Sequence, residues 1–258
     1  MHAMDYREGR DGSRPAIVMP KLNGIKMRYV PGHGCFSKDY KQWHPDKFKH
    51  INFPQGYELD GELYVHGWSL QRINSAVAIN SPEVTEDTKL IQYHVYDLPA
   101  VVREAAERMA MIDRIPFGAG IRPIEWRDLG QCCHQRKMNH FQAFVARGYE
   151  GMMMKTGLYV DGRTLNLLRK KHFEAEEFEF AYVVEGNGKN SNMVGALWCL
   201  AANGKPFKVG SGFSNDLAIW WWANKGTKRM PKKIKVQYQS LSDDGIPLNT
   251  SFLLAYYE

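Results

Sequence analysis

Residues 20–26 read Pro-Lys-Leu-Asn-Gly-Ile-Lys, and this stretch decides how the first half of the chain is interpreted. Ala16–Met19 and Lys26–Val30 on either side are strand-like, so the Asn-Gly pair between them predicts a turn. Lys21 directly follows the first strand. A lysine in this position is a candidate nucleophile if neighbouring cations or burial favour its neutral amine. Taken alone, a solvated turn lysine is the more common case.

Length and composition restrict the class of protein. The chain has 258 residues, a formal charge of +6, 44% hydrophobic and 24% charged residues. These values are typical of a globular protein with one large or two modest domains, and 12% aromatic residues exclude a disordered chain. No stretch approaches the ~18 apolar residues that span a bilayer. The first residues lack the apolar core of a secretory signal, so we expect a cytoplasmic protein.

The cysteines are Cys35, Cys132, Cys133 and Cys199. A disulfide framework is not expected in a chain of this length without an export signal. Cys132 and Cys133, together with His134 and His140, could suggest zinc. No second pair at ligand spacing follows, however, and the sequence favours ordinary thiols.

The residues up to about 173 mix predicted strands and helices. Tyr57–Val65 alternates apolar and acidic residues, which places Glu58, Asp60 and Glu62 on one strand face. Asn139–Arg147 reads as a helix with Asn139 as its N-cap and Gly148 after its end. Further strands are predicted at Ile91–Leu98, Gly151–Lys155 and Leu165–Phe173, and further helices at Ser69–Ile79 and Ala100–Ile112.

The character of the sequence changes near Glu174. Five strands are predicted beyond it, with one tryptophan-rich helix, Ser214–Asn224, between the third and the fourth. The strands are Phe178–Val184, Val194–Ala201, Pro206–Gly212, Ile234–Ser240 and Ser251–Tyr257. Five strands and one helix in ~80 residues are typical of a small barrel of the oligonucleotide-binding (OB) type.

Four more short motifs follow the 20–26 stretch. They are Asp60-Gly61-Glu62, Tyr96-Asp97, the run Glu150–Lys155 (Glu-Gly-Met-Met-Met-Lys), and Arg169-Lys170-Lys171. Charged strand faces are common, so each motif alone is weak. Together and in this order, they resemble the motifs of the covalent nucleotidyltransferase superfamily. The chain most closely resembles the ATP-dependent DNA ligases of the compact type found in bacteriophages.

The resemblance implies a role for each motif residue. Lys21 would attack the α-phosphate of ATP and carry AMP. Glu62 would bind the ribose, Tyr96 would stack on adenine, and Glu150, with Glu62 as a possible second ligand, would hold Mg²⁺ or Mn²⁺. Cationic side chains would contact the nucleotide and its phosphates; these are Lys26, Lys38, Lys155, Arg169 and Lys171. Lys38 is also a candidate for the phosphate at a DNA nick.

Some positions depart from the family pattern. Asn23 stands where the family has Asp, Lys26 where it has Arg, and Arg169 where it has Lys. The sixth family motif, an arginine near the C-terminus that helps to orient pyrophosphate, has no evident counterpart. Leu248 occupies its place.

A basic run follows the tryptophans of the C-terminal region: Lys225, Lys228, Arg229, Lys232, Lys233 and Lys235. A charge run is more often a solvated surface. Within a barrel suited to nucleic acid, contact with DNA phosphates becomes the better interpretation.

The resemblance therefore implies an α+β fold. Residues 1–173 would form an adenylating nucleotidyltransferase domain (ATP-grasp-like) and residues 174–258 an OB-fold domain. The implied function is sealing of nicks in duplex DNA through lysyl-AMP, by a monomer, in replication or repair, and in the host cytoplasm if the chain is of phage origin. An RNA ligase and, less favoured, a capping guanylyltransferase are alternatives within the superfamily. The altered first motif and the missing sixth keep open a non-catalytic nucleic-acid-binding protein.

Overall fold

The computed structural model describes residues 1–257 and divides into two compact units, Met1–Lys171 and the residues from His172 onward. The division lies two residues before the boundary at 173/174 expected from the change in sequence character. Each unit has a hydrophobic core of its own. Within the described part of the chain, no helix combines the length and the apolar character that crossing a membrane requires.

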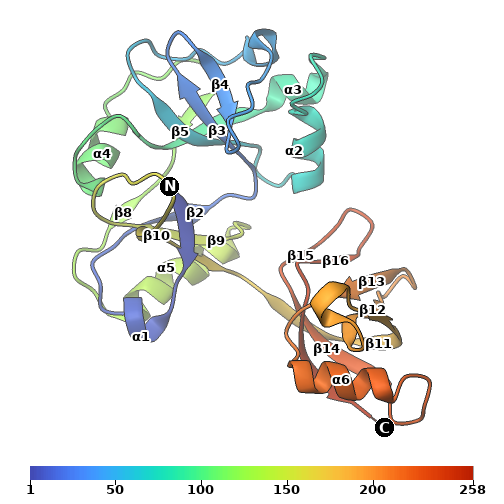
Figure 1. The fold of residues 1–258 in the computed structure, drawn as a ribbon. Coiled ribbons are helices and arrows are strands. Elements are labelled where there is room, and N and C mark those ends of the chain that lie inside the picture. The colour runs from blue at the N-terminus through green and yellow to red at the C-terminus, as the bar shows by residue number, and fades with distance from the viewer. Residues whose placement is uncertain (258) are drawn as a thin grey trace. The chain divides into compact units, whose positions relative to one another are not determined.

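The N-terminal unit contains two five-stranded sheets (Figure 1). The first has the order β1-β10-β9-β2-β8, formed by β1 (His2–Asp5), β10 (Arg163–Lys171), β9 (Gly151–Lys155), β2 (Ile17–Lys21) and β8 (Arg127–Asp128). The second has the order β4-β3-β5-β6-β7, formed by β4 (Gly34–Ser37), β3 (Ile25–Val30), β5 (Leu59–Tyr64), β6 (Gln92–Asp97) and β7 (Ile121–Pro123).

Helices pack beside both sheets of this unit (Figure 1). They are α1 (Glu8–Asp11), α2 (Leu70–Ala76), α3 (Glu86–Leu90), α4 (Ala105–Ile112) and α5 (His134–Ala146), with a 3₁₀ turn at Pro45–Phe48. One core lies on the second sheet and includes Leu59, Tyr93 and Met109. A smaller core lies between the first sheet and α5 and includes Val18 and Met152.

The predicted strands of this unit are confirmed within a few residues, but the N-cap of α5 is not. The helix begins at His134, with Cys133 as its N-cap, so the predicted cap Asn139 lies inside it. The residues before Asn139 carry little apolar periodicity, and the helix is stabilised instead by burial of Met138 and Phe144. Gly148 follows the helix with a positive φ of 82°, as a residue after a helix end often does.

The C-terminal unit is a five-stranded antiparallel sheet in the order β13-β12-β11-β14-β17. Its elements are β11 (Glu174–Glu185), a 3₁₀ turn at Gly188–Asn190, β12 (Val194–Leu200), β13 (Pro206–Val209), α6 (Asn215–Ala223), β14 (Lys233–Tyr238), β15 (Ser240–Leu241), β16 (Pro247–Leu248) and β17 (Ser251–Tyr256). All five predicted strands and the helix between the third and the fourth are confirmed.

The expected barrel is not fully closed. Its edge strands, β13 and β17, do not form a ladder with each other. They approach at one end, where Phe252 N–H donates to the carbonyl of Ser211 over 2.8 Å and Thr250 Oγ1 donates to the carbonyl of Lys208 over 2.7 Å. Trp221 of α6 is fully buried against Phe252, which explains one of the three consecutive tryptophans as core packing.

Candidate active site

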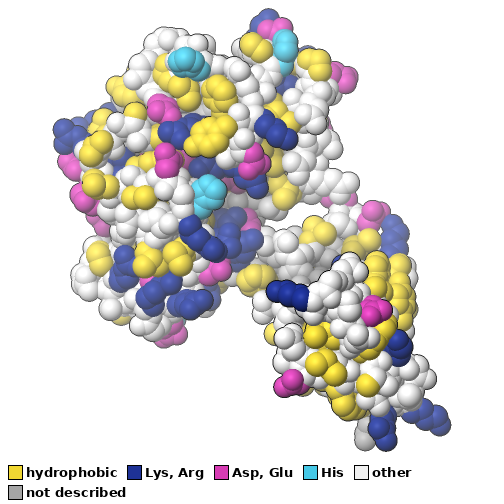
Figure 2. Space-filling model, viewed as in Figure 1, with side chains coloured by type: hydrophobic (Ala, Val, Ile, Leu, Met, Phe, Trp, Pro, Cys, Tyr) yellow, Lys and Arg dark blue, Asp and Glu magenta, His cyan; other side chains and the backbone are white. Residues whose placement is uncertain are grey.

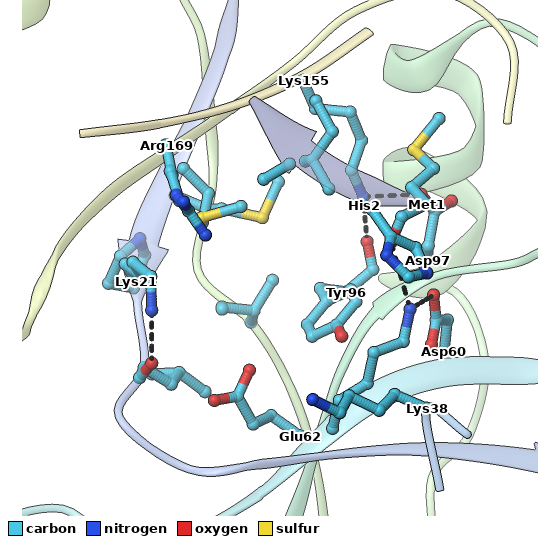
Figure 3. A pocket seen from close by; sticks show the side chains of 18 of the residues that line it. Met1, His2, Lys21, Lys38, Asp60, Glu62, Tyr96, Asp97, Lys155 and Arg169 are labelled. Atoms are coloured by element: carbon cyan, nitrogen blue, oxygen red, sulfur yellow. Dashed lines mark hydrogen bonds and ion pairs between the residues drawn. The ribbon is translucent and has the colours of Figure 1, made fainter. Parts of the chain in front are cut away.

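A cavity of the N-terminal unit has a volume of about 590 Å³ and is lined by residues of both sheets (Figure 3). Seven of the predicted site residues line it: Lys21, Lys26, Lys38, Glu62, Tyr96, Lys155 and Arg169. Residues separated by nearly 150 positions in the sequence thus meet in one place. The structure brings these seven side chains to one cavity, whereas Glu150 and Lys171 are not among the residues that line it. The role of each side chain toward a nucleotide stays a prediction.

Three strand ends meet beside this cavity. In the first sheet, Lys21 at the end of β2 pairs with Gly151, and Gly151 pairs with Lys171 at the end of β10. The register therefore places the side chains of Lys21 and Lys171 on either side of Glu150, which precedes β9. Lys21 Nζ contacts one carboxylate oxygen of Glu150, and Lys171 Nζ lies 3.1 Å from the other.

Glycine at 151 is required for this approach. A Cβ atom there would lie 2.1 Å from the carbonyl oxygen of Lys170 on the neighbouring strand. The Glu150 side chain is only 6% exposed and lies between two ammonium groups. The strand ends thus form a compact cluster of one carboxylate and two amines.

Glu62 approaches the same cluster from the second sheet. Its Oε1 accepts a hydrogen bond from Gly24 N–H over 2.8 Å, at the turn that follows Lys21. Burial raises the pKa of Glu62 to about 7, against the opposing effects of Lys21 and of the Gly24 hydrogen bond. The negative charge of Glu150 adds to the increase, so the two carboxylates are electrostatic neighbours.

Tyr96 projects its ring into the cavity, and the backbone behind it is held by buried charges (Figure 3). Lys155 Nζ donates to the Tyr96 carbonyl and lies 2.8 Å from Asp97 Oδ2. Arg108 Nε donates to Asp97 Oδ1 over 2.7 Å. The three charged side chains are at most 2% exposed. The ammonium of Lys155 is therefore paired inside the wall of the cavity; its contact with a nucleotide phosphate stays a prediction.

Lys26 forms another ion pair in the wall, 2.9 Å from Asp60 Oδ2. Tyr159 donates its hydroxyl proton to the same oxygen over 3.0 Å. Among residues 1–257, no hydrogen-bond partner reaches the buried Asp60 Oδ1. A lysine ammonium supplies one point charge, whereas an arginine could donate to both carboxylate oxygens. This difference explains why Asp60 Oδ1 has no hydrogen-bond partner among the described residues.

Arg169 and Lys38 complete the cationic lining. Arg169 Nε donates to Asp5 Oδ1 of β1 over 2.7 Å. This hydrogen bond holds the pKa of Asp5 below its usual value. Lys38 is exposed just after β4 and lines the cavity from its rim. Figure 3 shows Arg169 and Lys38 approaching the cavity from opposite sides.

The two glutamates are the candidate metal ligands. In the described part of the chain, no three His, Cys, Asp or Glu side chains gather as a metal site. Mg²⁺ commonly takes one or two carboxylates and completes its shell with phosphate oxygens and water. Glu62 and Glu150 fit that pattern only together with a bound nucleotide. In the cysteine region, Cys132 is buried and His134 hydrogen-bonds to Tyr6 over 2.8 Å.

The C-terminal basic run begins after α6 and extends into β14. Five of its side chains are exposed, those of Lys225, Lys228, Arg229, Lys232 and Lys233, and that of Lys235 is partly buried. Figure 2 shows Lys and Arg side chains protruding at this end of the unit. Lys225 Nζ also lies 3.1 Å from the centre of the Trp222 ring. Leu248, at the place of the sixth motif, is 41% exposed on β16.

Comparisons with known proteins agree with this geometry. Residues 185–254 match the family model for the DNA ligase OB-like domain. A DNA ligase of Haemophilus influenzae is 24% identical over 204 residues, which cover 77% of this chain and 73% of that protein. A structure from a study of the Lig E DNA ligases and their DNA binding has a TM-score of 0.80 at 21% identity, covering 99% of this chain and 98% of the other.

By sequence and by fold, the chain resembles DNA ligases. A Chlorella virus DNA ligase-adenylate adds a more distant match, with a TM-score of 0.54 at 18% identity over 100% of this chain and 97% of that one. The predicted resemblance and fold class are confirmed. These relatives are enzymes, which agrees with the expectation that this chain is an enzyme.

The motifs assigned no role to four side chains that hold the residues of the cavity wall. Asp97 and Arg108 form the buried network behind Tyr96, Tyr159 binds Asp60, and Asp5 binds Arg169. Asp97 was part of a quoted motif, so its signal was present. Tyr159 and Asp5 lie in segments with no periodic pattern, and only the folded chain brings them to the site.

Proposed function

We propose that this protein is an ATP-dependent DNA ligase that seals nicks in duplex DNA through a lysyl-AMP intermediate. The observation that carries the proposal is the position of Lys21. Its amine lies at the edge of a nucleotide-sized cavity, in contact with Glu150 and close to a second cation, Lys171. This is an arrangement suited to a nucleophile that reacts with a phosphate.

ATP would bind in the cavity through groups already in place. The ring of Tyr96 offers a stacking surface to adenine, typically worth ~1–3 kcal/mol per base. Glu62, with a pKa near 7, can accept or donate a hydrogen bond to a ribose hydroxyl. Arg169, Lys171 and Lys38 supply positive charge for the phosphates, and in a partly enclosed cavity such charge is screened less than on an open surface.

In the first step, the neutral amine of Lys21 attacks the α-phosphorus of ATP. A nitrogen–phosphorus bond forms, the bond between the α-phosphorus and the bridging oxygen breaks, and pyrophosphate leaves with that electron pair. The Glu150 carboxylate contacts Lys21 Nζ and is placed to take the amine proton. Lys171 and Arg169 stabilise the negative charge that spreads over the phosphate oxygens.

The next two steps join the DNA ends. An oxygen of the DNA 5′-phosphate attacks the phosphorus of lysyl-AMP, so a phosphoanhydride forms and Lys21 leaves with its nitrogen electron pair. The 3′-hydroxyl oxygen then attacks the 5′-phosphorus, loses its proton, and expels AMP. A divalent metal bound by Glu150 and Glu62 would supply Lewis-acid stabilisation of phosphate charge.

DNA would be held mainly by its phosphates. The exposed cations after α6 and Lys38 at the cavity rim supply such contacts. Binding through several phosphates falls steeply with salt, with a slope of about 0.9 per neutralised phosphate in a double-logarithmic plot. We therefore expect DNA affinity to depend strongly on ionic strength.

A sealing assay tests the proposal. A duplex with one nick, labelled at the internal 5′-phosphate, is incubated with ATP and Mg²⁺, and the label should move into a longer strand. Lys21→Ala should fail with this substrate but seal a nick supplied already adenylated, because only the first two steps need the amine. No product from either protein on either substrate would contradict the proposal. Nicks with an RNA strand test the RNA ligase alternative.

A further inference from the structure

Tyr40 has an unusual backbone conformation for its residue type. Three non-glycine residues among those described have a positive φ, namely Tyr40 (58°), Asn192 (63°) and Asn249 (55°). Asparagine tolerates the left-handed region, whereas a bulky aromatic residue there is a genuine outlier. Strained residues of this kind persist where the surrounding structure fixes them, and they concentrate at functional sites.

Hydrogen bonds of the surrounding turn fix this conformation. Tyr40 N–H donates to the Ser37 carbonyl over 3.0 Å, and Ser37 N–H donates to the Lys41 carbonyl over 2.8 Å. The Ser37 hydroxyl accepts from Asp39 N–H and from Lys41 N–H over 3.3 and 3.1 Å. These hydrogen bonds involve backbone atoms and the Ser37 side chain only. The turn therefore needs nothing from the tyrosine ring, and glycine would adopt the same conformation without strain.

The ring itself is left in solvent, because Tyr40 is 69% exposed. A side chain that costs backbone strain and contributes nothing to the core has no structural reason to be aromatic. An aromatic ring so placed is suited to a partner that offers a flat surface.

The position of the turn indicates the partner. Lys38, two residues before Tyr40, lines the proposed nucleotide cavity, so the turn that carries Tyr40 lies beside this cavity. Lys38 and Lys41 on either side of it are both exposed. A ring between two cations matches the alternation of bases and phosphates in a polynucleotide. At a nick, one strand lacks covalent continuity, so the terminal base is the easiest to unstack.

We propose that Tyr40 stacks on the nucleobase next to the nick while Lys38 and Lys41 contact the flanking phosphates. The inference rests on the proposed function, because it assumes that the DNA end approaches the cavity that holds the nucleotide. It adds a base-contacting residue to what is otherwise recognition of phosphates. It also assigns a purpose to the strained backbone at this turn.

Three variants test it. Tyr40→Gly and Tyr40→Asn keep the turn but remove the ring, and Tyr40→Phe keeps the ring. Loss of one stacked base corresponds to a Kd for nicked duplex raised about 5- to 150-fold, and we expect this of the first two only. The melting temperature of Tyr40→Gly should equal or exceed that of the wild type, because the strain is relieved. A 2-aminopurine at the nick should change its fluorescence with the wild type and Tyr40→Phe alone.

The outcomes separate this inference from the proposed function. Lysyl-AMP formation requires only ATP and the cavity, so all three variants should retain it. Wild-type affinity in Tyr40→Gly and Tyr40→Asn would overturn the inference and leave the ligase proposal standing. Parallel loss of lysyl-AMP would also overturn it, since the turn would then shape the nucleotide cavity. If the wild type forms no lysyl-AMP but binding still depends on the ring, the ligase proposal fails and the base contact stands.

Discussion

Replacing Asp97 by asparagine should strongly destabilise the N-terminal unit. Asp97 is 2% exposed and accepts hydrogen bonds from Arg108 Nε over 2.7 Å and Nη2 over 3.4 Å, with Lys155 Nζ at 2.8 Å. Asp97→Asn leaves two buried cations without their counter-charge. Breaking a buried ion pair on one side costs about 3–5 kcal/mol. At about 2–4 °C per kcal/mol for a unit of this size, the melting temperature should fall by roughly 6–20 °C.

A surface pair provides the matched control. Asp87 binds Arg72 through both oxygens, over 2.9 and 2.8 Å, but the Arg72 and Asp87 side chains are 49% and 38% exposed. Asp87→Asn should cost at most about 1 kcal/mol. Thermal unfolding followed by circular dichroism compares the two substitutions directly. Equal, small shifts would refute the argument that burial makes the Asp97 network stabilising.

The same network predicts a pH dependence. Burial alone would raise the pKa of Asp97, but Lys155 and Arg108 outweigh it and hold that pKa below its ordinary value. A carboxyl group with a lowered folded-state pKa stabilises the fold above its unfolded pKa, about 3.9, and the contribution disappears as pH falls through the folded value. Wild-type stability should therefore decline in acid, and the Asp97→Asn variant should show less of this decline.

Three further predictions concern other buried groups. Glu62 has a raised folded pKa of about 7 against about 4.3 unfolded, so wild-type stability should fall as pH rises through that window, and Glu62→Gln should flatten the profile. Lys137→Met leaves three carbonyl oxygens of residues 11–14 without their shared donor. It should lower the free energy of unfolding by about 2 kcal/mol or more, measured by denaturant unfolding, whereas Lys89→Met at an exposed position should not. Gly151→Ala should lower both melting temperature and lysyl-AMP yield, because its Cβ would collide with the Lys170 carbonyl; normal values of both would contradict the packing argument.

Many residues of the cavity could be predicted because they lie in short motifs on strands that the sequence pattern indicates. Lys21 follows an apolar strand, Glu62 lies on an alternating one, and Arg169 and Lys171 share one face of a third. Alternation fixes which side chains share a face, and the order of the motifs indicated the family. The register that brings Lys21, Glu150 and Lys171 together is a property of strand pairing, which no single segment contains.

The sequence could not show the partners that stabilise this arrangement. Arg108 lies on a helix where its spacing reads as an ordinary charged position, yet it is fully buried against Asp97. Strand β1 contains His2–Asp5 and has no strand-like pattern; it forms because β10 offers it a parallel edge. Asn139 satisfied a local capping rule, but tertiary burial extended α5 past it. In each case, long-range packing outweighed local preference.

The central claim is that Lys21 becomes covalently joined to AMP. Purified protein, freed of any bound nucleotide, is incubated with α-labelled ATP and Mg²⁺ and separated on a denaturing gel, and labelled peptides are then sequenced by mass spectrometry. Lys170→Ala is the matched control, since Lys170 lies on β10 with its ammonium 5.8 Å from the Phe141 ring. We expect label on Lys21 in the wild type and in Lys170→Ala, and none in Lys21→Ala. Absence of label from the wild type, or its persistence in Lys21→Ala, would contradict the claim.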